Sequence, residues 1–403
     1  MQRRHAIFVG LASGLSAVAL PSTAFAETRS YLDLTGSVGY SSNPYLQSDG
    51  DSSAFVRISA NGVHSIRGER GSTDFTGFVE NSTHLKDYGS KQIFALSAST
   101  RYQVSELVQL FGTAEFSGDI GGQLLGRFED VSSVPEPDPG VPPPPDDVFE
   151  PDVFNLDRRQ YRIGGQIGTT LTVSERDSVT VTASGKKVLY SEDSDDLNYA
   201  VATGTFAWQR RLSERTSAGA LMSVQRANYP DQERSTIFSP QLTLHTSLGV
   251  GWDADFAAGL SVVRRRTDSG SDQSVSPALD ASVCRSTEAE SYCGHASYST
   301  ESGTRQAARD TIRLGVAYSN RLNAKDTIQA NASLVRYSGD DFDTGDSKTT
   351  YYSGGVSFSR RFSDRLSAGA NFIARKRIQQ GEGGIPLDAS VSAFVRFRIG
   401  DRS

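Results

Sequence analysis

The most regular feature of the chain is an alternation of apolar and polar residues with a period of two. In the segment 387–400, LDASVSAFVRFRIG, one face carries Leu, Ala, Val, Ala, Val, Phe and Ile, and the other carries Asp, Ser, Ser, Phe, Arg and Arg. The segment 158–173, RRQYRIGGQIGTTLTV, repeats the pattern. After Glu27 no stretch of ten residues has a convincing helical period. The chain is therefore predicted to be all-β, with strands that have two chemically different faces.

Short and long connections alternate strictly between these segments. The seven short connections are predicted hairpin turns within residues 65–75, 103–110, 172–181, 210–220, 247–256, 321–330 and 360–370. The eight longer connections are rich in Asp, Ser, Gly and Pro and cover residues 42–52, 86–89, 120–156, 191–196, 230–234, 267–304, 339–347 and 380–386. Together these fifteen connections predict about 16 strands.

One eleven-residue phrase occurs at two of the short turns. Residues 210–220 read RRLSERTSAGA and residues 360–370 read RRFSDRLSAGA. Each copy lies between two alternating segments, so we interpret it as the same turn used twice. The basic and aromatic residues beside it, such as Trp208 and Phe358, are typical of the boundary between membrane and water.

The alternation of turns and loops predicts a transmembrane, antiparallel, up-and-down β-barrel. Such barrels have short periplasmic turns and longer extracellular loops, and the predicted strands of about 11 to 16 residues can cross the hydrocarbon when tilted. The rival is a soluble β-sandwich, but this chain has few large apolar residues for a core and its sheet edges would be open. We expect a bacterial outer-membrane location, with extracellular loops and both termini in the periplasm.

Composition and charge agree with this class. Hydrophobic residues make up 37% of the 403 residues and the formal net charge is -6, so nothing suggests a nucleic-acid partner. Residues 1–26 have a basic start, an apolar run and a small-residue end, which is typical of a cleaved secretory signal peptide. The predicted domains are this signal peptide and a barrel over residues 27–403.

The alternation also selects candidate pore-lining residues, most of them charged. They are Arg57, Arg101, Arg162, Arg313, Arg375, Arg377, Arg396, Arg398, Asp74, Glu80 and Glu115. Basic and acidic walls would create a transverse field that favours polar or charged solutes; equally, the charges could pair with each other and stiffen the wall. Interior aromatic residues could stack on sugar rings or simply fill space. They are Phe55, Phe78, Phe111 and Phe394.

Two long loops carry further features. The loop 120–156 contains VPEPDPGVPPPPDDVFEPDVF, which predicts an extended acidic segment that either narrows the lumen or projects outward. The loop 267–304 contains Cys284 and Cys293, which in an exported chain are predicted to form a disulfide worth roughly 2 to 3 kcal/mol. A zinc site with His295 is disfavoured because too few ligands are present. No catalytic motif, metal site or cofactor is predicted, so the chain is not expected to be an enzyme.

A family resemblance adds a direction. The stretch from Gly39 to Tyr45, GYSSNPY, together with the barrel layout and the acidic loop, resembles the β-barrel porin type 2 family, whose members are outer-membrane barrels often associated with exopolysaccharide export. The resemblance implies that polysaccharide and periplasmic export components are partners. Many such barrels end on an aromatic residue, whereas here Phe397 precedes a short tail; it would still serve the barrel assembly machinery as an insertion signal.

The predicted function is a passive outer-membrane conduit, by resemblance for a secreted exopolysaccharide, or for other polar solutes. A general diffusion porin is the nearer alternative. The more distant one is a structural or adhesive surface barrel that displays its loops. All three would be surrounded by outer-membrane lipid.

Overall fold

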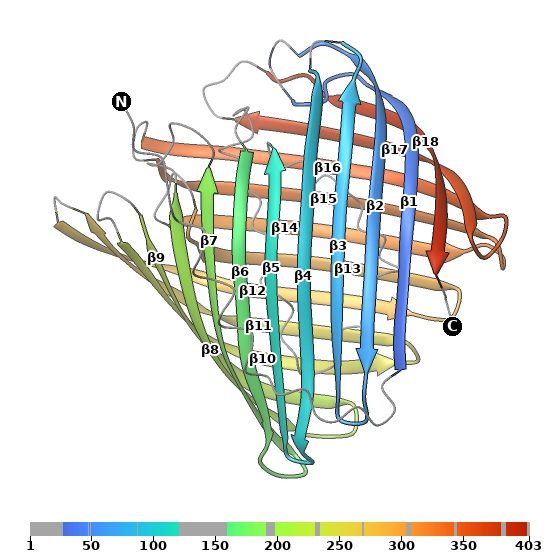
Figure 1. The fold of residues 1–403 in the computed structure, drawn as a ribbon. Helices are drawn as coiled ribbons and strands as arrows, with labels where there is room; N and C mark the ends of the chain where they lie inside the picture. The colour runs from blue at the N-terminus through green and yellow to red at the C-terminus, as the bar shows by residue number, and fades with distance from the viewer. Residues whose placement is uncertain are drawn as a thin grey trace, which may run out of the picture.

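A computed structural model describes residues 27–46, 48, 50–86, 88–120, 159–190, 198–229, 234–267, 270–303, 308–341, 345–379 and 384–400. The predicted signal peptide and most of the 120–156 loop lie outside these residues. The described residues form eighteen strands (Figure 1). Their bounds are β1 Glu27–Ser41, β2 Ser53–Arg67, β3 Gly71–His84, β4 Ser90–Ser105, β5 Val108–Ile120, β6 Arg159–Thr172, β7 Asp177–Tyr190, β8 Tyr199–Arg211, β9 Thr216–Asn228, β10 Arg234–Gly249, β11 Trp252–Thr267, β12 Gly270–Ser286, β13 Glu290–Glu301, β14 Arg309–Arg321, β15 Asp326–Asp341, β16 Gly345–Arg361, β17 Leu366–Gln379 and β18 Asp388–Gly400. In the described part of the chain, no helix is long and apolar enough to cross a membrane.

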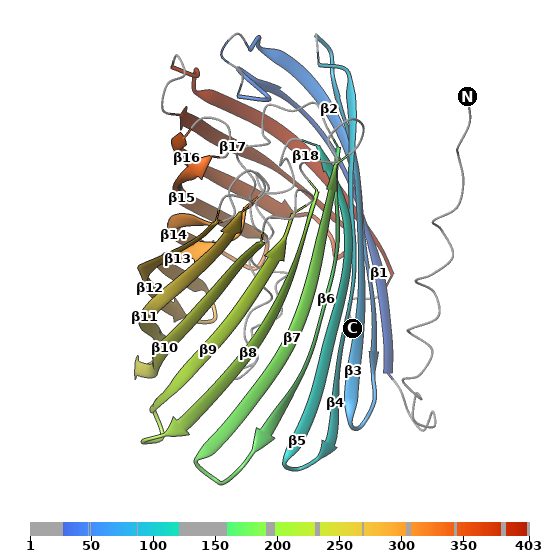
Figure 2. The same ribbon diagram turned by 90° about the vertical axis from the view of Figure 1, so that its left-hand side faces the viewer.

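The strands form one closed antiparallel sheet. Each pairs with its neighbours in sequence, and β1 pairs with both β2 and β18. The β1–β18 pairing runs from Tyr31 opposite Gly400 to Ser41 opposite Ser390. Closure leaves neither β1 nor β18 as an open edge. Figure 2 shows the sheet curving around an interior, with β13–β17 on the side opposite β2–β6. The predicted antiparallel barrel is confirmed.

The two ends of the barrel differ. One end, here called the turn end, carries short connections of two to four residues, each between an even-numbered strand and the odd-numbered strand that follows. They are residues 68–70, 106–107, 173–176, 212–215, 250–251, 287–289, 322–325 and 362–365. The opposite end, here called the loop end, carries the other connections, among them 42–52 and 380–387. All seven short turns that the sequence predicts are present at the turn end.

The predicted count of about 16 strands is too low because residues 267–304 are not one long loop. They contain a hairpin of β12 and β13, which raises the strand count to 18. Serine and aspartate are frequent in β12 and Pro277 lies in its middle, so its composition is typical of a loop, although Val275, Leu279 and Val283 alternate on its outer face. Pro277 is tolerated because it pairs only toward β11, since the pairing with β13 starts at Leu279. Cys284 and Cys293 lie directly opposite each other on these strands and form the predicted disulfide.

The alternation places apolar side chains on the outside of the barrel. In β1 the outward residues Leu32, Leu34, Val38 and Tyr40 are exposed, whereas the alternate residues, such as Asp33, are partly or fully covered. The same outward exposure of large apolar residues recurs on the other strands, for example at Phe206, Leu260 and Val391. The polar half of each strand therefore faces inward.

The repeated phrase builds the same turn twice. Ser213 and Ser363 donate backbone hydrogen bonds to the carbonyls of Thr216 and Leu366, at 3.0 and 3.2 Å. In each copy the second arginine also reaches the preceding turn: Arg211 Nη2 donates to the carbonyl of Glu175 at 2.5 Å, and Arg361 Nη2 donates to the carbonyl of Ala324 at 2.6 Å. The phrase thus specifies its own turn and ties it to the neighbouring one.

The outward face can be tested at the middle of β8. Replacing Phe206 with arginine is expected to destabilise the barrel by about 2–4 kcal/mol, the cost of this charge at the bilayer midplane. Thr205→Arg, one residue away on the inner face, is expected to cost much less. Equilibrium unfolding in lipid vesicles measures both, and equal costs would contradict the assignment of the two faces.

Candidate functional site

The candidate site is the inner wall of the barrel. All eleven predicted lining residues occupy strand positions that alternate with exposed apolar residues, so they share the inner face. They are Arg57, Asp74, Glu80, Arg101, Glu115, Arg162, Arg313, Arg375, Arg377, Arg396 and Arg398. Their role in a pore stays a prediction, but their common face is a property of the fold.

Several of these charged residues form ion pairs with residues on the adjacent strand. Arg57 Nε lies 3.2 Å from Glu80, Arg313 Nη2 2.8 Å from Glu301, Arg375 Nη2 2.6 Å from Asp388 and Arg398 Nη2 2.6 Å from Asp33. Sequence reasoning missed three of the acceptors, Asp33, Glu301 and Asp388. The strand pattern puts Asp388 on the polar face, but no sequence signal identified its partner. Much of the wall charge therefore serves to hold the wall together.

A further acidic stretch lies on β11 and β12 and was also missed. The inward positions there include Asp253, Asp255 and Asp280. His245 and His295, on the adjacent strands β10 and β13, lie 2.7 Å from Asp255 and 3.8 Å from Asp280. The arginines at 375, 377, 396 and 398 lie on β17 and β18. The inner wall thus carries an acidic group on β11 and β12 and a basic group on β17 and β18, of which Arg375 and Arg398 are paired with Asp388 and Asp33.

The interior aromatic residues mainly fill space. Phe55, Phe111 and Phe394 are buried, and each lies over a glycine directly opposite on the adjacent strand, at positions 39, 168 and 369. A β-carbon at any of these glycines would collide with the ring. The rings lie against the wall, so these three phenylalanines do not present open faces for stacking on sugars.

At the loop end, the β1–β2 connection folds inward. Leu46 is fully buried and packs with Tyr337 of β15, Tyr351 of β16 and Ile385. In the closed ring, β17 and β18 lie between β16 and β1, so Leu46 reaches Tyr351 across the inside of the barrel. Leu46 also has a φ of 50°, a left-handed backbone that costs about 1–2 kcal/mol for a residue with a β-carbon. Burial of its side chain offsets this cost.

Asp388 holds this segment in place. Its carboxylate accepts hydrogen bonds from the Ser41 hydroxyl at 2.6 Å and from the Asn43 backbone N–H at 3.1 Å. Arg375 bonds the same carboxylate at 2.6 Å and donates to the carbonyl of Pro44 at 3.0 Å. Both Asp388 and Asn43 are buried. The GYSSNPY stretch is therefore explained structurally as the part of the chain that anchors the inward fold.

A second connection, between β13 and β14, also crosses the inside. The Ser302 hydroxyl lies 3.1 Å from that of Ser235 on β10, and Tyr229, just after β9, donates to the carbonyl of Gly303 at 2.9 Å. The strands β11 and β12 lie between. Arg309, fully buried, bonds Glu301 at 3.2 Å and lies 4.2 Å from the Tyr337 ring centre. Arg309 thus links this connection to the Leu46 cluster, and the two narrow the loop end.

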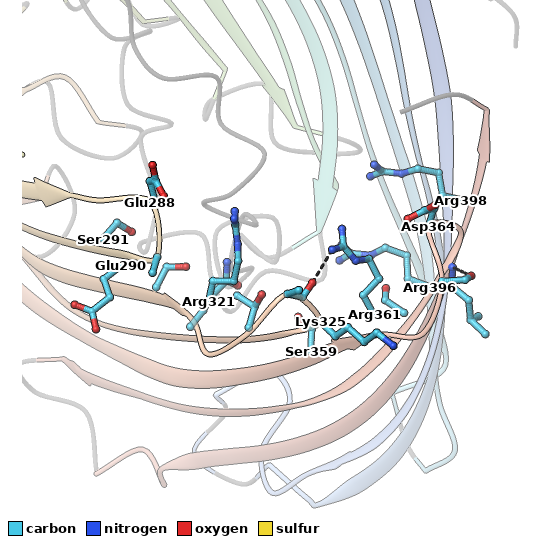
Figure 3. Close-up of a pocket in the computed structure, with 18 of the residues that line it drawn as sticks. Glu288, Glu290, Ser291, Arg321, Lys325, Ser359, Arg361, Asp364, Arg396 and Arg398 are labelled. Atoms are coloured by element: carbon cyan, nitrogen blue, oxygen red, sulfur yellow. Dashed lines mark hydrogen bonds between the residues drawn. The ribbon is translucent and has the colours of Figure 1, made fainter. Parts of the chain in front are cut away.

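The turn end is lined by charged residues. A recess of about 830 Å³ lies there, bounded by the turns 286–291, 321–327 and 359–367 and by the end of β18 (Figure 3). Its charged lining residues are Arg321, Lys325, Arg361, Arg365, Arg396, Arg398, Asp33, Glu288, Glu290 and Asp364. The lining is polar and mixed in charge, with basic residues in excess. A hydrated solute would meet such a mouth without having to cross an apolar surface.

Among the described residues, no group of three or more His, Cys, Asp or Glu side chains is placed to hold a metal ion. The two cysteines are bonded to each other. They are therefore not available as thiolate ligands beside His295.

No protein-family model and no curated protein matches the chain. Solved structures do align with most of it. Pseudomonas aeruginosa OccK2 (OpdF), determined in complex with glucuronate, aligns with a TM-score of 0.47 and 10% identity over 93% of this chain and 98% of that one. Pseudomonas aeruginosa OpdL aligns at 0.43 and 11% over 93% and 99%. The ferric citrate transporter FecA aligns at 0.48 and 10% over 90% and 63%. Scores of this size do not establish a shared function.

Removing the carboxylate of Asp388 is expected to release the inward segment. In Asp388→Ala the Arg375 guanidinium and the Asn43 N–H lose their acceptor, and loss of one partner of a buried pair is costly. Hydrogen exchange at the amides of Asn43 and Leu46 should accelerate about tenfold or more. The control is Asp326→Ala, which removes an outward ion pair with Arg360 at the turn end. Unchanged exchange at Asn43 would mean that Asp388 does not hold the segment.

The contact between the Phe111 ring and Gly168 predicts that a second substitution restores the stability that a first one removes. Gly168→Ala should destabilise the barrel by about 1–3 kcal/mol through overpacking against Phe111. In the double variant with Phe111→Ala the two closest contacts are gone and only the Thr182 methyl, at 2.9 Å, remains near, so much of the cost of the alanine should disappear. A double-mutant cycle from equilibrium unfolding measures the coupling, and simple additivity would refute the contact.

Proposed function

We propose that this chain is a passive channel of the bacterial outer membrane for small polar solutes. The observation that carries the proposal is the closed ring of 18 strands with an exposed apolar outer face and a polar, charged inner face. Barrels of 16 to 18 strands are wide enough to leave an aqueous channel. A soluble protein would not expose apolar residues around its whole circumference.

The orientation belongs to the same proposal. The turn end would face the periplasm and the loop end the outside, as in other barrels with short turns and longer loops. Solutes would enter from outside past the inward-folded connections and leave through the turn end, whose recess has an excess of basic residues. The separated acidic and basic parts of the wall would orient dipolar or charged solutes and disfavour apolar ones.

Export of a secreted exopolysaccharide is a finer proposal. It is supported by the resemblance of residues Gly39 to Tyr45 to the porin type 2 family. Those residues anchor the inward fold at the loop end, so a polymer would pass only if this fold moved aside. The porin proposal does not require such a movement.

Planar-bilayer recordings test the channel. The purified chain should give a stable conductance, and Leu46→Ala with Ile385→Ala should raise it, because the inward segment loses its packing against Tyr337 and Tyr351. Leu260→Ala, on the lipid-facing surface, is the matched control and should leave the conductance unchanged. A silent barrel in all forms would overturn the channel and favour a barrel that only displays its loops.

A soluble polysaccharide distinguishes the finer proposal. Added to the open channel, it should lower the conductance if the interior admits a polymer, and have no effect in a porin for small solutes. Deleting residues 131–151 within the proline-rich loop tests the separate prediction that this loop narrows the lumen, in which case the conductance should rise.

A further inference from the structure

The outer face of β9, β10 and β11 carries four arginines near the loop end. Arg226, Arg234, Arg264 and Arg266 all occupy outward strand positions and are exposed. On these strands the outward positions farther from the loop end hold apolar residues such as Met222, Leu242 and Leu260. The pore does not use these arginines, since they point away from the interior.

Strand register gathers the four into two adjacent rows. Arg234 lies directly opposite Arg266. In the next row Thr236 lies between Arg226 on one side and Arg264 on the other. Like charges directly opposite each other on neighbouring strands are destabilising. The sheet therefore holds four positive charges close together at a cost that an anion would remove.

The position of the two arginine rows along the strands shows which part of a membrane would surround them. The row immediately below consists of Val224, Phe238 and Val262, which are mutual partners on the same three strands. The arginines thus begin where the apolar band ends. In a membrane this is the level of the lipid headgroups.

Basic residues at the opposite boundary are arranged differently. At the turn end, outward Arg210 lies 4.0 Å from Asp177 and outward Arg360 lies 3.7 Å from Asp326, while outward Arg285 lies over the Trp252 ring, 5.7 Å from its centre. Among the residues that the structure describes, no carboxylate forms an ion pair with any of the four arginines. The asymmetry suits two leaflets of different headgroup charge, with the more anionic one at the loop end.

We propose that Arg226, Arg234, Arg264 and Arg266 bind the phosphates of a membrane lipid whose headgroup carries two phosphate monoesters. Guanidinium groups bind phosphate in a bidentate manner. A phosphate monoester carries a charge of about -1.5 to -2 near neutral pH, so two of them balance four arginines. The acyl chains would lie on the apolar row below. This inference rests on the membrane location proposed above, but not on the channel activity.

Native mass spectrometry of the folded chain in neutral detergent tests the proposal. The probes are a diphosphorylated glycolipid, its monophosphorylated counterpart and phosphatidylglycerol. The diphosphorylated lipid should bind most tightly, and Arg234→Gln with Arg264→Gln and Arg266→Gln should weaken its binding about tenfold or more. The same changes to lysine should retain part of the affinity, because lysine keeps the charge but not the bidentate geometry.

The matched control removes three outward arginines at the turn end, Arg210, Arg285 and Arg360, each to glutamine. It should bind the diphosphorylated lipid within about twofold of the unmodified chain. Equal weakening in both triple variants, or equal affinity for phosphatidylglycerol, would overturn the proposal. Full competition by millimolar inorganic phosphate would also overturn it, because the surface would then be a site for a free anion. Conductance recorded on the same samples tests the channel activity independently, so a failure of lipid binding can be distinguished from a failure of the channel proposal.

Discussion

The structure depends on pairing both edges of every strand, so that no row of backbone N–H and C=O groups is left open. In hydrocarbon an unpaired N–H or C=O group costs several kcal/mol, so a sheet must close on itself. Here closure falls between β1 and β18, the two strands farthest apart in sequence. The Asp33–Arg398 ion pair, with its charges on directly opposite residues of the two strands, reinforces this contact. Because the partners are separated by almost the whole chain, this is the strand pairing with the largest loop-closure cost.

Once the ring is closed, the interior becomes a space that the loops can use. The connections after β1 and β13 do not pack against their own strands alone; they reach inward across two neighbouring strands and meet through Arg309 and Tyr337. The ion pairs Arg375–Asp388 and Arg309–Glu301 hold them there, and removing one partner of a buried pair is costly. One end of the barrel is therefore shaped by side chains from distant segments, whereas the other is shaped by local turns.

This difference explains which features of the structure could be predicted from the sequence. Strand alternation and turn chemistry are local, so the barrel, the seven turns and the inward face of residues such as Arg162 and Arg377 could be predicted. The β12–β13 hairpin was missed because the Gly, Ser and Asp residues at the start of β12 and Pro277 in its middle are typical of loops, although Val275, Leu279 and Val283 alternate on its outer face. The anchoring role of Asp388 was missed because its partners, Ser41 and Asn43, lie at the opposite end of the chain. The space-filling role of Phe111 could not be predicted, because it depends on Gly168 lying opposite on the adjacent strand.

The repeated turn phrase has a consequence for how such a barrel can change in size. Each copy closes its turn with hydrogen bonds inside the phrase and attaches to the preceding turn through an arginine and a backbone carbonyl, neither of which depends on the identity of neighbouring side chains. A hairpin that carries the phrase is thus a self-contained building unit. Duplicating it adds two strands at once, keeps the start of β1 and the end of β18 at the same end of the barrel and widens the ring without disturbing the closure between them.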